Sequence, residues 1–272
     1  MVPCYYETFT LTRHHKSILN NSTFWQGRLK AAGIHLAISL AVAAMAALLV
    51  FYVWYPYPYR EISGGRELFM LVVAVDVVMG PFMTLAVFNL SKPRKELSRD
   101  LAVIAVLQLA ALGYGLWTVS VARPVHLVFE IDRFRVVHAI DVETVLLKRA
   151  APALQELPLT GPTLLSIREF KDSKENFDAT MAALQGLQLG ARPDLWQSYG
   201  KAKDKITAAA KPVDELKKRF PARANEIDNA LKSAPANASV GYIPLVGRNT
   251  FWTVLINTET VEVLAFVPLD PY

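Results

Sequence analysis

Three long apolar stretches lie in the first half of the chain, and the second half has none. Each stretch holds about 20 residues or more, which is the length that crosses a bilayer as an α-helix. The pattern therefore predicts three transmembrane helices, at residues 31–55, 68–90 and 101–121. Residues 123–272 are numerous enough to bury a core of their own, and they predict a separate domain.

This separate domain begins and ends with the pattern of β-hairpins. Apolar side chains alternate with less apolar ones over residues 125–131, as in a half-buried strand. A turn at Asp132 and Arg133 then leads into a second apolar run at residues 134–139. The C-terminal end predicts three further strands, at Tyr242–Val246, Phe251–Asn257 and Val261–Pro268.

The middle of the domain, residues 171–233, has the pattern of polar helices. Phe177, Met181 and Leu184 recur at spacings of four and three residues, as along one face of a helix. Because strands open and close the domain and helices fill its middle, the two ends are expected to pair in one antiparallel sheet. The predicted fold class is a membrane protein of three transmembrane α-helices followed by an exported α+β domain with an antiparallel sheet.

The distribution of lysine and arginine predicts the orientation of the helices. Eight basic residues flank the membrane on one side, and only two lie in the loop that joins the first two helices. The two are Arg60 and Arg66, and the eight are Arg13, Lys16, Arg28, Lys30, Lys92, Arg94, Lys95 and Arg99. Because cytoplasmic loops carry the basic excess, the N-terminus is expected inside the cell. The chain then divides into a cytoplasmic tail (residues 1–30), a membrane region (31–122) and an exported domain (123–272).

Charge and motifs exclude several classes of function. The net charge is +5, but residues 123–272 hold 19 basic and 18 acidic side chains, which argues against a nucleic-acid partner. The single cysteine, Cys4, lies on the predicted cytoplasmic side, so no disulfide is expected in the exported domain. No nucleophile elbow, zincin motif, phosphate-binding loop or Cys-x-x-Cys is present. We expect no enzyme activity, no catalytic residues, no cofactor and no metal.

Asp76 is the only charged residue between residues 68 and 90. A carboxylate at membrane depth costs roughly 2.5–3.5 kcal/mol, so it is normally partnered and marks a functional site. Gly80 and Pro81 follow it and tend to bend the helix. A count of about 1.5 Å per residue places Tyr114 of the third helix at the depth of Asp76, and Gln108 at another depth. Asp76 therefore either ties the helices together through Tyr114 or lines a polar slot for the helix of another protein.

The histidines and the lysine-rich run have more ordinary interpretations. His35 lies near the cytoplasmic end of the first helix, where its imidazole can reach toward water. His126 and His138 have no cysteine or carboxylate at metal-ligand spacing and are expected to be strand residues. The lysines of residues 201–205 are expected on a solvated helix face.

Several segments together resemble a known family. They are Phe51-Tyr-Val-Trp-Tyr-Pro56, Val75-Asp-Val-Val-Met-Gly-Pro81 with Thr84 and Val87-Phe-Asn89, Arg94-Lys-Glu-Leu-Ser-Arg-Asp100, residues 122–136 and Ile243-Pro-Leu-Val-Gly-Arg248. In this order they resemble the type IV pilin accessory proteins of the TfpX/TfpZ kind, over residues 23–272. The resemblance implies a protein of the bacterial inner membrane with a periplasmic C-terminal domain, which assists or modulates pilin assembly.

The resemblance also implies a partner for Asp76. A pilin has an apolar N-terminal helix with an intramembrane glutamate and, after processing, a free amine, and both groups need a polar partner in lipid. We expect the protein to act as a membrane chaperone that binds this helix and touches the globular head of the pilin. The expected residues at the pilin helix are Asp76, Gly80, Pro81, Met83, Thr84 and Tyr114. The alternative function is a membrane-anchored periplasmic ligand-binding sensor, which would act without any pilin.

The charge asymmetry generates a prediction about topology. A reporter that is active only in the periplasm should be active when it is fused after Tyr272. The same reporter fused within residues 91–100 should be inactive, and a cytoplasmic reporter should show the opposite pattern. Activity of the periplasmic reporter in the 91–100 loop would mean that the orientation is inverted.

Overall fold

The computed structural model describes residues 8–232, 234–235 and 237–272, with the side chains from residue 24 onward. Cys4 lies outside the described residues. The chain forms two compact units. We call residues up to 47 together with 69–117 the helical unit, and residues 48–68 together with 118–272 the sheet unit.

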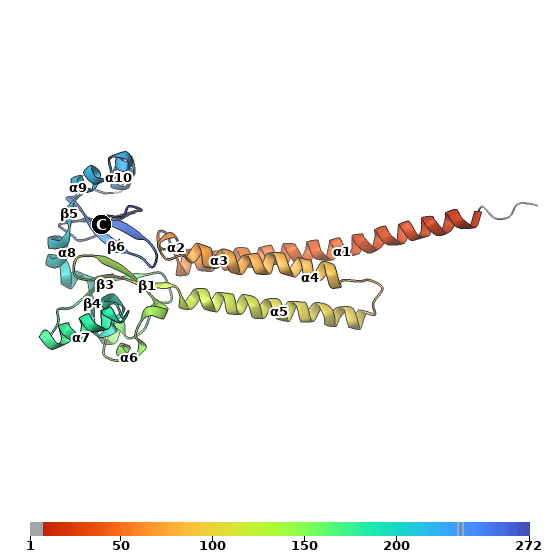
Figure 1. The fold of residues 1–272 in the computed structure, drawn as a ribbon, viewed down its shortest axis with the longest axis horizontal. Coiled ribbons are helices and arrows are strands. Elements are labelled where there is room, and N and C mark those ends of the chain that lie inside the picture. Colours follow the sequence, from red (N-terminus) through yellow and green to blue (C-terminus); the bar gives the residue numbers. More distant parts are fainter. Residues whose placement is uncertain (1–7, 233, 236) are drawn as a thin grey trace, which may run out of the picture. The chain divides into compact units, whose positions relative to one another are not determined.

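The three apolar stretches are helical, as the sequence predicts (Figure 1). The helices are α1 (Thr8–Leu48) with the π-helical turn η1 (Leu49–Trp54), then α3 (Gly65–Ala74), η2 (Val75–Met79) and α4 (Gly80–Val87), and last α5 (Arg94–Val121). The segments Phe24–Trp54, Gly65–Val87 and Arg94–Val121 are long and apolar enough to cross a membrane. Because no proline interrupts the chain between Thr8 and Trp54, α1 also includes most of the expected N-terminal tail.

The sheet unit contains one mixed sheet in the order β4-β3-β1-β2-β6-β7-β8, and the short β5 also pairs with β6. The strands are β1 (Pro124–Phe129), β2 (Phe134–His138), β3 (Thr163–Ile167), β4 (Trp196–Ser198), β5 (Lys211–Pro212), β6 (Val240–Val246), β7 (Phe251–Asn257) and β8 (Val263–Val267). The helices of this unit are α2 (Tyr59–Ile62), α6 (Thr144–Leu147), α7 (Ser173–Leu184), α8 (Lys203–Ala209), α9 (Val213–Arg219) and α10 (Ala224–Leu231). The expected α+β fold is therefore confirmed.

The pairing of the sheet differs from the expectation at two places. The predicted hairpin is present, with Phe129 opposite Phe134, and the C-terminal strands pair antiparallel. The two ends of the domain also meet, but β2 and β6 pair parallel, and so do β1 and β3. The expectation of a wholly antiparallel sheet is thus wrong, because the connections between these strands return the chain in the same direction.

The alternation of side chains in β1 indicated a strand buried on one face, but the strand is buried on both faces. All six residues of the strand are buried. Leu127 and Phe129 belong to one hydrophobic cluster, whereas Val125 and Val128 belong to a second cluster that includes Trp196. Both faces are covered because the middle of the domain packs against the side that a simple hairpin would expose to water.

The connection between the first two membrane helices is part of the core of the sheet unit. Tyr59 and Ile62 lie in the same hydrophobic cluster as strands β1, β2, β6 and β7. Tyr55 is fully buried, and its hydroxyl donates to the carbonyl oxygen of Val119 at 3.1 Å. The backbone N–H of Gly161 also donates to the carbonyl of Val53 at 2.7 Å. Residues 48–68 therefore fold with the C-terminal domain.

This packing predicts that Ile62→Ala destabilises the sheet unit, although Ile62 precedes the domain in the sequence. Removal of a fully buried aliphatic side chain costs about 2–5 kcal/mol of unfolding free energy. Hydrogen exchange of the β7 amides in the full-length protein should reveal this loss. Val145 is 72% exposed, so Val145→Ala should change the exchange by less than about 0.5 kcal/mol. Equal protection in both variants would place residues 48–68 outside the cooperative unit.

Candidate functional site

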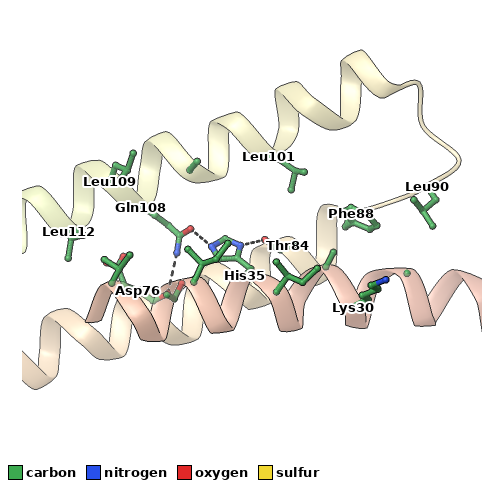
Figure 2. A pocket seen from close by; sticks show the side chains of 17 residues that line it. Lys30, His35, Asp76, Thr84, Phe88, Leu90, Leu101, Gln108, Leu109 and Leu112 are labelled. Atoms are coloured by element: carbon green, nitrogen blue, oxygen red, sulfur yellow. Dashed lines mark hydrogen bonds between the residues drawn. The ribbon is translucent and has the colours of Figure 1, made fainter. Parts of the chain in front are cut away.

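The helical unit contains a cavity of about 740 Å³ between its three membrane helices, which we call the membrane cleft (Figure 2). Seventeen residues line it, and most of them are apolar. The ionisable ones are Lys30, His35 and Asp76, and the uncharged polar side chains are Ser39, Thr84 and Gln108. The cleft is thus an apolar groove with a small number of polar groups, which is the usual composition of a binding site.

A chain of hydrogen bonds joins the three helices inside this cleft. His35 Nδ1 lies 2.5 Å from Thr84 Oγ1, and His35 Nε2 lies 2.6 Å from Gln108 Oε1. Because an amide oxygen only accepts, His35 Nε2 donates to Gln108, and His35 Nδ1 pairs with the Thr84 hydroxyl. Each apolar span therefore contributes one polar side chain, and these three side chains are hydrogen-bonded to one another.

Gln108 extends this chain to the backbone of the second span. Its Nε2 donates to the carbonyl oxygen of Asp76 at 3.2 Å. Asp76 lies in the π-helical turn η2, where a carbonyl normally accepts from the residue five positions later. That residue is Pro81, which has no backbone N–H. The Gln108 amide thus replaces a donor that the helix cannot provide.

Gly80 makes this contact possible. A Cβ at Gly80 would lie 1.9 Å from Gln108 Nε2, so a larger residue would displace the glutamine. At Gly115 of α5 a Cβ would likewise clash with Val72, at 2.6 Å. The second and third spans therefore approach each other closely at two points, one at Gly80 of the second span and one at Gly115 of the third. Small residues allow such close approach in membrane helix pairs.

The carboxyl group of Asp76 takes no part in this network. The side chain is half-buried and lines the membrane cleft (Figure 2). Among the described residues, only the backbone carbonyl of Asp76 accepts from Gln108, and no side chain donates to its carboxyl group. Because no described side chain donates a hydrogen bond to this carboxyl group, it is available to a ligand that can donate a hydrogen bond or carry a positive charge.

The structure separates the predicted site residues into two groups. Asp76 and Thr84 line the membrane cleft, and Gly80 lies against Gln108. Pro81, Met83 and Tyr114 do not line it, and Tyr114 is 70% exposed, with its ring against Trp117.

Two interpretations of the membrane residues are wrong. Gln108, and not Tyr114, reaches Asp76, because Gly115 packs beside Val72 and Gly80 beside Gln108, which sets the register of the two helices. His35 points inward to Thr84 and does not reach toward water. One sequence signal could have indicated the roles of Gln108 and His35. Each apolar span carries few polar side chains, and inside lipid these must form hydrogen bonds with one another.

The polar residues of the sheet unit behave largely as expected. His126 and His138 are buried residues of β1 and β2, and burial lowers the pKa of His126 to about 4. The lysines of residues 201–205 are exposed. In the described part of the chain, no group of three His, Cys, Asp or Glu side chains could hold a metal ion.

Three apolar spans, a mostly apolar cleft between them and an α+β domain define a membrane-anchored protein with a helix-lined cleft. Comparisons with known proteins identify its family. The model of the fimbrial assembly protein FimB matches residues 23–64. Two fimbrial assembly proteins of Dichelobacter nodosus, of serogroups I and E1, are 37% and 36% identical over 245 residues, which cover 87% of this chain and 95% of each relative.

A third relative, the fimbrial assembly protein of serogroups C1 and C2 from the same organism, is 43% identical over 113 residues. These cover 42% of this chain and 86% of the relative. No solved structure matches the chain. The chain belongs to the family of fimbrial assembly proteins and has a role in fimbrial biogenesis, which confirms the resemblance to the type IV pilin accessory proteins.

The contact between Gly80 and Gln108 predicts that Gly80→Ala lowers the melting temperature of the full-length protein in detergent. The added methyl group displaces the Gln108 amide, and overpacking of this kind costs about 1–3 kcal/mol. Gly113→Ala is the matched control, because a Cβ there meets no atom within 4 Å and alanine favours a helix.

The double variant Gly80→Ala with Gln108→Ala tests the mechanism. It removes the clash, so its melting temperature should be higher than the sum of the two single effects predicts. Strict additivity of the two substitutions would show that Gly80 does not act through Gln108.

Proposed function

We propose that the protein binds type IV pilin in the membrane cleft and so assists fimbrial assembly as a membrane chaperone. The observation that carries this proposal is the Asp76 carboxyl group, which faces the cleft and has no hydrogen-bond donor among the described side chains. Family membership supports the pathway, because the relatives carry the name fimbrial assembly protein. The partner and its place in the cleft are our inference.

The chemistry of the cleft suits a membrane helix with a polar group. Its walls are mostly apolar, so they match the side chains of a helix that already lies in lipid. The free amine that the family resemblance implies for a processed pilin would donate to an ionised Asp76, and a pilin glutamate would share a proton with it. In either case the ligand would satisfy an intramembrane carboxyl group that otherwise costs free energy.

The other role for Asp76, tying the helices together, has less support. Within the described residues, the ties between the three spans come from His35, Thr84 and Gln108, and Asp76 contributes only its backbone carbonyl. The carboxyl group can therefore change without the loss of any hydrogen bond within this network.

The remaining parts of the proposal follow the charge pattern and the family resemblance. The protein would lie in the bacterial inner membrane with its N-terminus in the cytoplasm and the sheet unit in the periplasm. The sheet unit would contact the globular head of the pilin. The proposed role is binding without catalysis, because the spans hold only one carboxyl group at membrane depth and a protease of the aspartyl type needs two.

In-cell photocrosslinking tests the proposal. Photoreactive residues at Ile38 and Leu109, which are exposed and line the cleft, should crosslink to pilin. Asp76→Leu should reduce the crosslink at least about tenfold, because a hydrogen bond to a charged group contributes about 1.5–3 kcal/mol. Asp76→Asn keeps a hydrogen-bonding group and should retain part of the crosslink.

Two controls separate pilin binding from a role in packing. Tyr114→Phe should leave the crosslink unchanged, because Tyr114 does not line the cleft. A photoreactive residue at Met70, which is 58% exposed and outside the cleft, should give no pilin crosslink. The proposal fails if Asp76→Leu accumulates normally, crosslinks fully and supports normal piliation.

A further inference from the structure

The sheet unit contains a second cavity, of about 250 Å³, at the point where β2 and β6 separate. The two strands pair only at Phe134 with Leu245 and at Arg135 with Val246. The residues that follow these pairs line the cavity, together with the segment after α7. We call it the basic cavity, because Arg135, Arg248 and His138 lie in its wall with Asp141 as the single acidic residue.

Arg135 and Arg248 each have N–H donors from which no described residue accepts a hydrogen bond. Arg135 Nε donates to Glu130 Oε1 at 2.7 Å, and Arg248 Nη2 donates to Asp141 Oδ1 at 2.9 Å. A guanidinium group carries five N–H donors in a fixed plane. The described residues accept no further hydrogen bond from either group. Each arginine can therefore bind a second anion without leaving its first partner.

His138 adds a buried nitrogen that lacks a partner. The imidazole is almost fully buried, and its Nδ1 lies 3.0 Å from Asp141 Oδ2. Its Nε2 has no hydrogen-bond partner among the described residues. Burial favours the protonated form of Asp141, but hydrogen bonds from His138 and Arg248 outweigh it and lower the pKa of this carboxyl. A ligand in the cavity would give the buried Nε2 of His138 a partner.

An exposed row of apolar side chains runs along α7 toward this cavity. Phe177, Met181 and Leu184 are 64%, 39% and 77% exposed, and their spacing places them on one face of the helix. The helix is held to the domain by its other face, where Ala179 is fully buried. Gly186, which lines the basic cavity, follows Leu184 by two residues. We call the three side chains the α7 row.

We propose that the α7 row and the basic cavity form one docking surface for a protein segment that carries a carboxylate next to apolar side chains. The carboxylate would accept from Arg248 and Arg135 in the cavity, and the apolar side chains would cover the α7 row. The unused N–H donors of the two guanidinium groups suit a carboxylate, and the neighbouring apolar row favours a peptide over a free phosphate or a nucleic acid. This surface lies in the sheet unit and goes beyond the proposed binding of a helix in the membrane cleft.

Two labelled peptides test this surface on the purified full-length protein in uncharged detergent. The first ends in Leu-Leu-Asp with a free terminal carboxylate, and the second ends in Leu-Leu-Asn with a terminal amide. Fluorescence anisotropy should show that the first binds at least about tenfold more tightly, because hydrogen bonds to charged groups contribute about 1.5–3 kcal/mol. Equal affinity for the two peptides, or no binding of the first, would overturn the proposal.

Substitutions on the surface locate the binding. Arg248→Gln should weaken the binding of the acidic peptide at least about tenfold and leave the affinity for the amide peptide unchanged. Leu184→Ser should weaken both peptides. The matched controls are Arg149→Gln and Leu159→Ser, which change exposed residues outside the surface and should have no effect. If Arg248→Gln or Leu184→Ser behaves like its control, the peptide binds elsewhere and the proposal is wrong.

Discussion

Polar groups inside a lipid bilayer must find partners within the protein, and this constraint organises the helical unit. His35, Thr84 and Gln108 come from three different spans and bind one another. Gln108 also donates to the carbonyl of Asp76, which the π-turn and Pro81 leave without a backbone donor. Lipid provides no hydrophobic force between helices, so such hydrogen bonds and the close approach at Gly80 and Gly115 hold the spans together. The Asp76 carboxyl is then left for the cleft.

The sheet unit depends on a segment that the sequence places between two membrane helices. Tyr59 and Ile62 complete a hydrophobic cluster whose other members come mainly from the C-terminal strands. The match to the family model, residues 23–64, covers the first span together with most of this segment. The segment that the family model matches thus includes residues that serve both as a helix connection and as part of a folded core.

The main elements were predictable because their patterns are local. Apolar length alone indicates the three spans, and alternation with a turn indicates the hairpin of β1 and β2. β3 was missed because its pattern is short and its partner β1 lies far away in sequence. A lone charge in an apolar run indicated that Asp76 lines a slot between the spans, and it does line the membrane cleft. The residues around Asp76, such as Gln108, were not predicted correctly. A count of 1.5 Å per residue assumes regular helices that enter the membrane at equal depth.

The sequence by itself determined the three apolar spans, the α+β domain, the charge asymmetry and the presence of one carboxyl group at membrane depth. Only the tertiary structure decided that Gln108 reaches Asp76, that His35 turns inward, and that β2 and β6 pair parallel. The physical reason is that apolar length and alternation depend on residues close in the chain. Helix register and strand pairing depend instead on contacts between distant residues, such as Gly80 with Gln108, which local patterns do not encode.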